Sequence, residues 1–421
     1  MSGVTVGYRR YLLPTPMDED PPSADRPTTG SQPSGRGTNP LITWLRRPID
    51  PRKHIREVDG LRFLAIGNVV VAHIVPTVAN QYTLFTGLSI QGEWLLRTLA
   101  EGRRGVSLFF VISGFVLGLP FLRAGLAGKK VSTRAYFLRR LTRLEPPYIV
   151  SLALIMIGEI VFLGRSATSL LPHFLFGAPY LNTLIYGDRS PINSVAWSLE
   201  VEVQFYILMP LIAVVLVRAL SKRRAILAAG IAVSLLLQTQ SFSHSIRWSE
   251  SLTGSFHGFL AGVLIADFYL REGWADAPGS RGWDIAFLLG LVTFVFMPLF
   301  TPLLLHPVTV LAACTLLVVG ALRGTRARAV LRRPLVWTIG GMCYSIYLLH
   351  LQIIRLLLRP MHLLITSSLG GFVPDLVLIC LVVIPVVLIV SGAFFLLVEL
   401  PCMRWSQAVS LRAKAEPART A

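Results

Sequence analysis

An arginine and a histidine share one face of an apolar segment near the start of the chain. Arg62 and His73 stand eleven positions apart in the stretch VDGLRFLAIGNVVVAHI, Val58 to Ile74. On an α-helix this spacing is three turns plus about 20°, with about 16 Å between the two residues along the axis. Ionisable residues inside a membrane are costly and usually mark a site. His73 is therefore a candidate general base; the alternative is a topology charge at Arg62 and a packing histidine at 73.

A second polar cluster opens the stretch SVAWSLEVEVQFYILMP. Ser198, Glu202 and Tyr206 recur every four residues and therefore share one helical face. Glu200 and Gln204 share another face. A carboxylate close to a buried histidine sets its tautomer and raises its basicity, so one of these glutamates is a candidate partner for a catalytic histidine. The alternative is that both are acidic residues favoured in the first turns of a helix.

A third cluster is basic and lies just before an apolar run. In RAYFLRRLTRLEPPY, Arg140 and Arg143 are three positions apart, which puts them on the same side of a helix. Guanidinium groups packed this closely are suited to binding phosphate groups. Topology alone is the competing explanation for the basic character.

The rest of the chain indicates how these clusters are positioned. Of the 421 residues, 53% are hydrophobic and only 15% are charged, against roughly 25% in an ordinary soluble domain. Long apolar runs recur between residues 59 and 400, which predicts an all-α polytopic membrane protein. About ten spans are expected: 59–79, 105–122, 146–163, 197–218, 224–241, 250–270, 283–300, 304–322, 338–359 and 373–398. The loop 164–196 carries apolar patches, and part of it is a candidate re-entrant segment.

The charges predict the orientation of the chain. Although the net charge is +18, the basic residues gather in short loops between apolar runs, which favours topology over nucleic-acid binding. Basic clusters fall between the second and third, fourth and fifth, and eighth and ninth spans, and the intervening loops are poorer in them. With an even number of spans, both termini are expected in the cytoplasm, with the protein in the inner or plasma membrane.

The segments on either side of the apolar region differ from it in composition. Residues 1–45, rich in Pro, Ser, Thr and Gly, are predicted to form a disordered cytoplasmic tail without the apolar core of a signal peptide. Residues 46–404 are the predicted transmembrane domain, and 405–421 a second cytoplasmic tail. The four cysteines are read as packing residues, and no metal-ligand spacing appears among the His, Asp and Glu residues.

These three stretches and three others, taken together, resemble a known family of integral-membrane acyltransferases, the acyltransferase-3 proteins. The first helix resembles that family's Arg-x10-His pattern, and RRLTRLEPPY resembles its Arg-x-x-Arg motif. WSLEVEVQFYILMP is similar to its Trp-Ser-Leu-x-Val-Glu-x-Gln-Phe-Tyr signature. Three further stretches, GVSLFFVISGF, YSIYLLH and VELP, match its second helix and its last two spans. The matches run in family order from residue 58 to residue 404.

The resemblance implies transfer of an acyl group, acetyl by default, from cytoplasmic acyl-CoA to a hydroxyl of a glycan, lipid-linked glycan or glycoside. It implies His73 as the catalytic base, with Glu202 orienting it or binding acceptor hydroxyls. Arg62, Arg140 and Arg143 are the expected donor-binding residues. Five others are weaker candidates for acceptor binding or support: Trp197, Ser198, Gln204, Tyr206 and His350. Acyl-CoA is expected as a co-substrate, with no permanently bound cofactor, no metal and no nucleic acid.

Two positions depart from the family pattern. Ser107 stands where many members have an aspartate, which weakens any role for a charge there. Glu200 stands where a small residue is usual, and the alignment favours Glu202 as the functional glutamate. The extra periplasmic domain that some members carry is not expected within these 421 residues.

Two other functions remain compatible with the residues alone. Ten spans with buried His, Glu and Arg also suit a proton-coupled transporter or exporter, although no inverted repeat is visible. A non-catalytic membrane partner that only passes the acyl group to another enzyme is the third possibility. Acylation of a glycan by the purified protein distinguishes the enzyme from both.

Overall fold

Helices make up the described part of the chain. The computed structural model describes residues 44–48, 54–86, 94–240, 245–302, 305–358 and 372–415, all within the unit Pro40–Ala421. In these ranges there is no strand, only an isolated bridge between Ser280 and Gly324. The all-α class is therefore confirmed. The predicted N-terminal tail lies outside the described residues except for Trp44 and Leu45.

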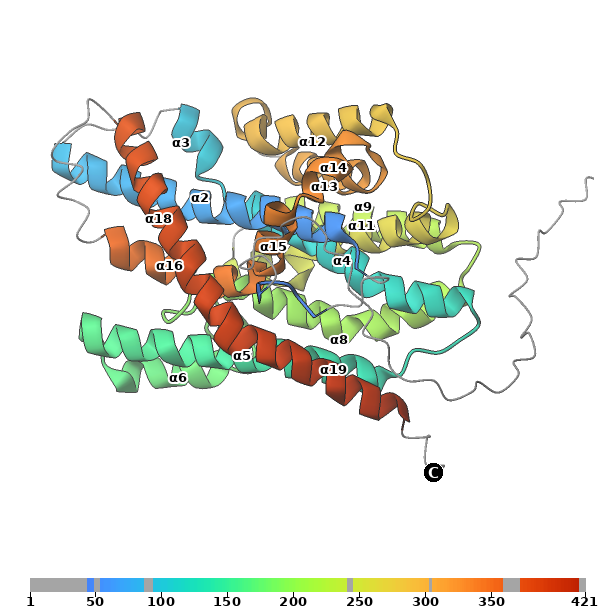
Figure 1. The fold of residues 1–421 in the computed structure, drawn as a ribbon, viewed down its shortest axis with the longest axis horizontal. Helices are drawn as coiled ribbons and strands as arrows, with labels where there is room; N and C mark the ends of the chain where they lie inside the picture. Colours follow the sequence, from blue (N-terminus) through green and yellow to red (C-terminus); the bar gives the residue numbers. More distant parts are fainter. Residues whose placement is uncertain are drawn as a thin grey trace, which may run out of the picture. The chain divides into compact units, whose positions relative to one another are not determined.

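Each of the ten predicted spans coincides with helix (Figure 1). The helices that cover them are α2 (Arg56–Thr86), α4 (Arg103–Leu126), α5 (Thr133–Leu163), α8 (Trp197–Arg218), α9 (Arg223–Gln240), α11 (Leu252–Arg271), α12 (Arg281–Phe300), α13 (His306–Arg323), α15 (Pro334–Gly341) with α16 (Cys343–Leu358), and α18 (Phe372–Phe394). Shorter helices join them: α3 (Trp94–Leu99), α6 (Ala167–Gly177), α7 (Asn182–Tyr186), α10 (Ile246–Ser249) and α14 (Arg326–Leu331).

The number of membrane crossings is smaller than ten by length and composition. Seven helices in the described part of the chain are long and apolar enough to cross a membrane, or eight if α15 and α16 form one span. α9 and α12, which occupy two predicted spans, are not among them. The polytopic membrane class is confirmed, and the count of ten is not.

The predicted span 338–359 is not one straight helix. The axes of α15 and α16 differ by 72° across a break at Met342. Gly340 and Gly341 end α15, and glycine lowers helix stability because it has the most backbone freedom to lose. α15 and α16 nevertheless both pack against α2.

α5 is longer than its predicted span, because the helix continues through Pro146 and Pro147. It begins after Ser132, whose hydroxyl accepts a hydrogen bond from the Ala135 N–H at 3.3 Å. It ends at Gly164, which adopts a left-handed φ of 64°. The basic motif therefore lies inside the same helix that enters the membrane.

α4 and α11 pack with their backbones in close approach. A Cβ atom at Gly114 would lie 2.0 Å from the Phe259 carbonyl oxygen, and one at Gly262 would lie 2.1 Å from that of Val111. Small residues at a contact let membrane helices approach and gain van der Waals packing. This pair fixes the position of α4, which lines both cavities described below.

The C-terminal region is one continuous helical run with a change of register. α18 passes into a π-helical turn, η3 (Phe395–Glu399), and then into α19 (Leu400–Ala415) (Figure 1). α18 packs against α16, and α19 packs against α5, where the Ser406 hydroxyl donates to the Arg139 carbonyl at 2.8 Å. Residues 405–415, assigned to a tail in the sequence analysis, are helical.

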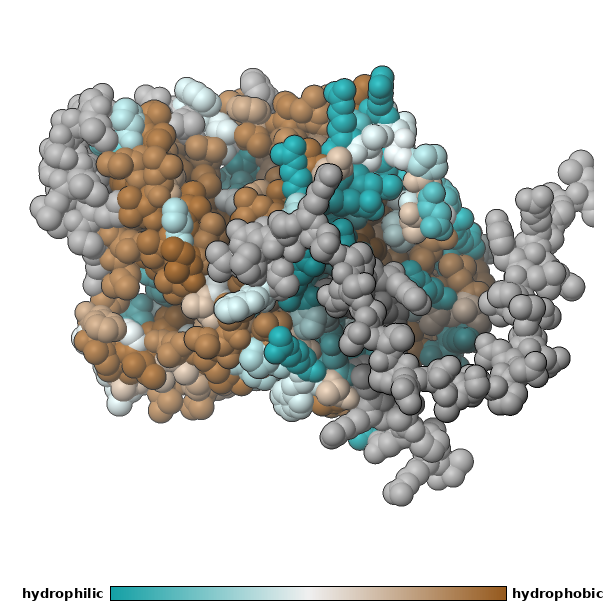
Figure 2. All heavy atoms as spheres, viewed as in Figure 1, coloured by the Kyte–Doolittle hydropathy of each residue, from teal (hydrophilic) through white to brown (hydrophobic). Residues whose placement is uncertain are grey.

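The lipid-facing surface is identified by its exposed apolar side chains. Leu381, Ile389 and Leu397 on the C-terminal run are 69%, 70% and 77% exposed. On α5, Val161 and Phe162 are similarly exposed. Figure 2 shows an extended hydrophobic surface over this part of the visible face, as expected for helices in contact with lipid.

Candidate active site

A large cavity collects most of the predicted site residues. We call it the first chamber; it encloses about 790 Å³, counting the part open to solvent. Its walls come from α2, α4, α5, α8, α15, α16 and the segment 44–48. Six predicted site residues line it: Arg62, Arg140, Arg143, Ser198, Glu202 and Tyr206. Ser198, Glu202 and Tyr206 all face this chamber, as their four-residue spacing predicted.

Arg140 and Arg143 reach the first chamber without a carboxylate partner. In the described part of the chain, neither guanidinium lies within 4.0 Å of an Asp or Glu oxygen. The Arg140 guanidinium lies 5.1 Å from the centre of the Tyr206 ring. Two half-buried cations without counter-ions can hold an anion, because charge-assisted hydrogen bonds to phosphate or carboxylate are the strong ones.

Arg62 is held by a buried carboxylate that the sequence analysis did not select. One Asp59 oxygen accepts hydrogen bonds from Arg47 at 2.8 Å and from Arg62 at 2.6 Å, and the other lies 2.6 Å from His54 Nε2. Asp59 is 1% exposed. Its three-residue spacing from Arg62 was the available signal, because residues at i and i+3 meet on a helix.

The two glutamates of α8 have different environments. Glu202 lines the first chamber and accepts a hydrogen bond from the Ser113 hydroxyl at 2.5 Å. Glu200 is 1% exposed and accepts the Thr183 backbone N–H at 2.9 Å. Thr183 lies in α7, so Glu200 ties the loop between α5 and α8 to the helix bundle.

That loop folds back along α5. α6 packs against α5, and the Tyr148 hydroxyl donates to the Gly177 carbonyl at 3.0 Å (Figure 1). The rings of Tyr148 and Tyr180 stack with centroids 4.5 Å apart. The chain therefore returns from the end of α5 to the level of Tyr148, and the re-entrant course of this loop stays a prediction.

His73 lies beside His350 rather than beside Glu202. The centroids of the two imidazole rings are 5.2 Å apart and their planes are tilted by 48°. Neither histidine is among the residues lining the first chamber. In the described part of the chain no recorded contact joins Glu202 to His73, so the expected Glu202–His73 arrangement is not seen.

The hydrogen bonds of His350 fix its tautomer. Its Nδ1 lies 2.9 Å from the Tyr347 carbonyl oxygen, which can only accept, so Nδ1 carries the proton. Nε2 is then an acceptor; it is buried and has no hydrogen-bond partner in the described part of the chain. A buried lone pair without a partner is costly and needs an explanation, and a functional site is one.

Tyr347 connects this histidine pair to the first chamber. Its ring lines the chamber and lies 5.7 Å from the ring of His350. Its hydroxyl donates to the Val195 carbonyl at 2.8 Å and lies 2.6 Å from the Ser198 hydroxyl. The pair is thus one helical turn beyond the chamber wall along α16.

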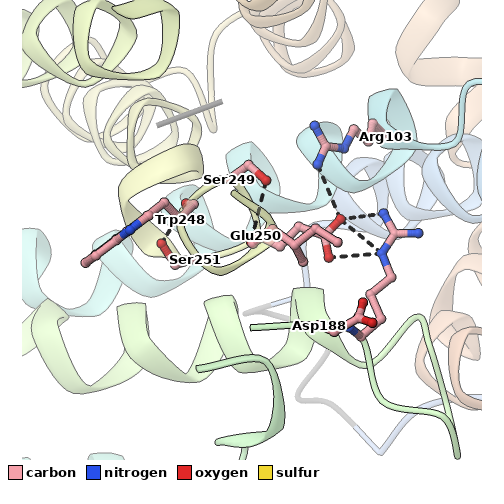
Figure 3. A network of polar contacts seen from close by, with 8 residues as sticks. Arg103, Asp188, Trp248, Ser249, Glu250 and Ser251 are labelled. Carbon is pink, nitrogen blue, oxygen red and sulfur yellow. Dashed lines mark hydrogen bonds and ion pairs between the residues drawn. The ribbon is translucent and has the colours of Figure 1, made fainter. Parts of the chain in front are cut away.

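The remaining predicted residues of α8 lie near a buried ion network. Glu250, 2% exposed, binds the Arg189 guanidinium through both oxygens and pairs with Arg103 at 3.3 Å (Figure 3). The hydrogen bond to Glu250 raises the pKa of Arg189, so this arginine stays charged. Arg103 lies 5.9 Å from the centre of the Trp197 ring, and the Gln204 side-chain oxygen accepts the Leu252 N–H at 2.9 Å.

A second carboxylate that the sequence did not single out, Glu399, is the last residue of the π-helical turn. Glu399 accepts one hydrogen bond from the Ser345 hydroxyl at 2.6 Å and another from the Ser345 backbone N–H at 3.2 Å. Its Oε1 is buried with no partner in the described part of the chain. π-Helical turns occur frequently at functional sites, and this turn brings Glu399 to the start of α16, next to the first chamber.

The amino-acid sequence matches the profile of the acyltransferase-3 family, described as an acyltransferase domain, over residues 55–393. The chain belongs to this family. Because this domain is an acyltransferase domain, the chain is a membrane acyltransferase. No solved structure matches the fold.

Three relatives illustrate the range of the family. Acyltransferase MdmB of Streptomyces mycarofaciens is 28% identical over 82% of this chain and 91% of its own length. Nodulation protein 10 of Rhizobium leguminosarum bv. viciae is 24% identical over 72% of this chain and 84% of its own. A putative O-acetyltransferase of Staphylococcus aureus, strain COL, is 23% identical over 72% of this chain and 51% of its own.

Proposed function

We propose that this acyltransferase-3 protein transfers an acyl group, acetyl by default, from acyl-CoA to a hydroxyl of a glycan or glycoside. The observation that carries the proposal is the pair of unpaired guanidinium groups, Arg140 and Arg143, in the first chamber. Coenzyme A has several phosphate charges, which such groups bind well. The O-acetyltransferase name of a relative supports oxygen as the acceptor atom.

The histidine pair supplies the proton transfers. An alcohol is a poor nucleophile until a base takes its proton as the new bond forms. We assign this role to His73. The acceptor oxygen bonds to the acyl carbon as the carbon–sulfur bond breaks, and the proton taken by His73 passes to the sulfur, releasing free CoA. Tyr347, between His350 and the first chamber, places the thioester close to the pair.

His350 acts as a positioning residue in this scheme. Its Nε2 has no hydrogen-bond partner in the described part of the chain, and with the ring centroids 5.2 Å apart a small shift of the two rings would let it accept the His73 N–H. In the proposed mechanism this hydrogen bond holds His73 in one tautomer and orientation, the task that a carboxylate performs in other catalytic pairs. Glu202, with Ser113, then binds acceptor hydroxyls, and Arg62 orients the donor while Asp59 holds it in place.

The test begins with the acceptor. Glycans and small glycosides from a deletion strain and its parent are compared by mass to find the acylated product. The purified protein in lipid nanodiscs is then given this acceptor and radiolabelled acetyl-CoA. His73→Gln should lose about 10²–10⁴-fold in transfer rate, because glutamine cannot take up the proton. His306→Gln is the matched control, because His306 lies at the start of α13 and pairs with Glu101 at 3.3 Å.

Each competing function has a different outcome. Label transferred to the protein but never to a glycan by purified protein indicates an acyl carrier that needs a second enzyme. A deletion strain that fails to export a glycoside whose acylation is unchanged indicates a transporter. Well-expressed His73→Gln with near wild-type transfer would remove His73 from the role of base.

A further inference from the structure

A second cavity lies against the first chamber, separated from it by one layer of side chains. This second chamber encloses about 480 Å³, counting the part open to solvent. It is formed where α4, α8 and α9 meet α10, α11 and α13. Its lining includes the polar or aromatic residues Arg103, Ser107, Phe110, Trp197, Gln238 and His257. On the predicted topology this is the extracytoplasmic half of the membrane domain.

The two chambers differ in charge. Among the described residues that line the second chamber, Arg103 is the only Arg, Lys, Asp or Glu, and it shares Glu250, at 3.3 Å, with Arg189. The first chamber instead contains Arg140 and Arg143, and no carboxylate of the described residues pairs with either of them. The first chamber therefore suits an anion, whereas the second, whose one arginine is tied to Glu250 and whose other described lining residues include no Lys, Asp or Glu, suits a ligand held by uncharged groups.

The polar groups of the second chamber suit hydroxyl groups. The side-chain oxygen of Gln238 is buried and has no hydrogen-bond partner in the described part of the chain. The Ser107 hydroxyl donates to the Arg103 carbonyl at 3.0 Å and still has lone pairs to accept with. A buried acceptor without a partner is costly unless a ligand supplies the donor. Each hydroxyl of a sugar supplies one.

Aromatic side chains form the apolar part of the same wall. The rings of Trp197 and Phe110 meet edge to face, with centroids 6.4 Å apart, and Phe110 also stacks on Phe259 at 4.8 Å. Flat apolar surfaces beside a few placed polar groups are the usual lining of a site for a small polar ring. Together they indicate a ligand with both C–H faces and hydroxyl groups.

Phe110 and α8 bring the two chambers together. Phe110 lines both, and the consecutive residues Trp197 and Ser198 line one chamber each. Ser198 also binds the Tyr347 hydroxyl at 2.6 Å, next to His350. A ligand seated in the second chamber is thus one side chain away from the place where the donor thioester is expected.

We propose that the second chamber binds the acceptor as an uncharged sugar ring, whose reacting hydroxyl passes Phe110 into the first chamber. This inference rests on the proposed function. It adds the site of the acceptor and the condition that the sugar ring is uncharged, held by Gln238, Ser107 and the aromatic wall. It also gives Phe110 a role, as the partition between acceptor and donor.

The first experiment fills the second chamber. Ser107→Trp is expressed in the deletion strain, and alkali-labile labelled acetyl groups are counted in the cell's glycans and small glycosides. Acetylation should fall by about tenfold or more, since a site that loses the room and hydrogen bonds for its ligand discriminates strongly. The affinity of the purified protein for radiolabelled acetyl-CoA should stay within about twofold. Ser169→Trp, on the exposed side of α6, is the matched control and should change neither.

A second variant tests the same site without a bulky side chain, in case Ser107→Trp does not fold. Gln238→Leu removes the unpaired acceptor and keeps the volume, so acetylation should fall about two- to tenfold with acetyl-CoA binding unchanged, the worth of one hydrogen bond. Full acetylation in both well-expressed variants would overturn the acceptor site. Equal losses of acetylation and acetyl-CoA binding would also overturn it, because the two chambers would not be separate sites. A wild-type protein without acetyl-CoA binding or acetylation would overturn the proposed function, and this inference with it.

Discussion

His73 of α2 and His350 of α16 face one another with ring centroids 5.2 Å apart, in the interior of the membrane domain. His350 is fully buried, and its Nδ1 proton is committed to the Tyr347 carbonyl at 2.9 Å. The two rings are therefore not equivalent. The His350 ring is held by the backbone, whereas in the proposed function the His73 ring is available for the acceptor, so substitutions at the two positions should have different effects.

Glutamine should be tolerated at position 350 but not at position 73. His350→Gln keeps an acceptor for the His73 N–H, whereas His350→Phe removes it and keeps the ring volume. The Phe variant should lose about tenfold in kcat, the worth of one hydrogen bond, with an unchanged KM for acetyl-CoA. Steady-state kinetics and thermal unfolding of both purified variants test this. Equal activity of His350→Phe and wild type, or a loss explained by lower stability alone, would contradict the positioning role.

Arg140→Ala and Arg143→Ala should each weaken acetyl-CoA binding more than acceptor use. A charge-assisted contact to phosphate is worth about 1.5–3 kcal/mol, which is roughly 10- to 150-fold in Kd. Equilibrium binding of radiolabelled acetyl-CoA to nanodisc-embedded protein measures this. Arg134→Ala removes an exposed charge from the same helix and should leave Kd unchanged. If all three variants bind like wild type, Arg140 and Arg143 serve only as topology charges.

The two glutamates of α8 should separate stability from activity. Glu200→Ala leaves the Thr183 N–H without its acceptor in a buried place, which costs about 1–3 kcal/mol and should lower the unfolding temperature. Glu202→Gln keeps the shape of a side chain that lines the first chamber, and should keep the unfolding temperature but reduce transfer. Thermal unfolding and transfer rates of both variants decide. A stable, inactive Glu200→Ala protein would reverse the two assignments.

The orientation of the helices should follow the basic loops. Reporter fusions after residues 130, 222 and 328 should report cytoplasm, because Lys and Arg accumulate in those loops. Fusions after residues 165 and 246 should report the opposite side. Residue 165 is preferred to residue 180, since Tyr180 packs on Tyr148 within the folded-back loop. A cytoplasmic signal at 165 would invalidate the predicted alternation.

The sequence correctly predicted which residues of a single helix share a face. The four-residue spacing of Ser198, Glu202 and Tyr206 was sufficient to place them on one face, and all three line the first chamber. The same reasoning put Arg140 and Arg143 together. These relations depend only on helix periodicity, which is a property of the local chain.

Relations between helices were not predictable in the same way. Periodicity gives the face of α2 that carries His73, but not which helix meets that face, and the partner proved to be His350 rather than Glu202. Because α15 and α16 are not one straight helix, the position of His350 relative to α2 does not follow from the periodicity of the predicted span. The role of Asp59 was only partly predictable: its three-residue spacing from Arg62 is a periodic signal, whereas its other arginine partner, Arg47, precedes the first span and gives none.

The π-helical turn Phe395–Glu399 also changes how the end of the chain should be interpreted. A π turn closes its hydrogen bonds at i→i+5, so it holds one more residue than an α turn in the same rise. Everything after Glu399 is therefore rotated by about 100° from where an unbroken α-helix would put it. A helical wheel drawn through 372–415 as one helix assigns the wrong faces to α19. Deleting one residue within 395–399 would straighten the run, turn Ser406 away from Arg139 and remove Glu399 from Ser345.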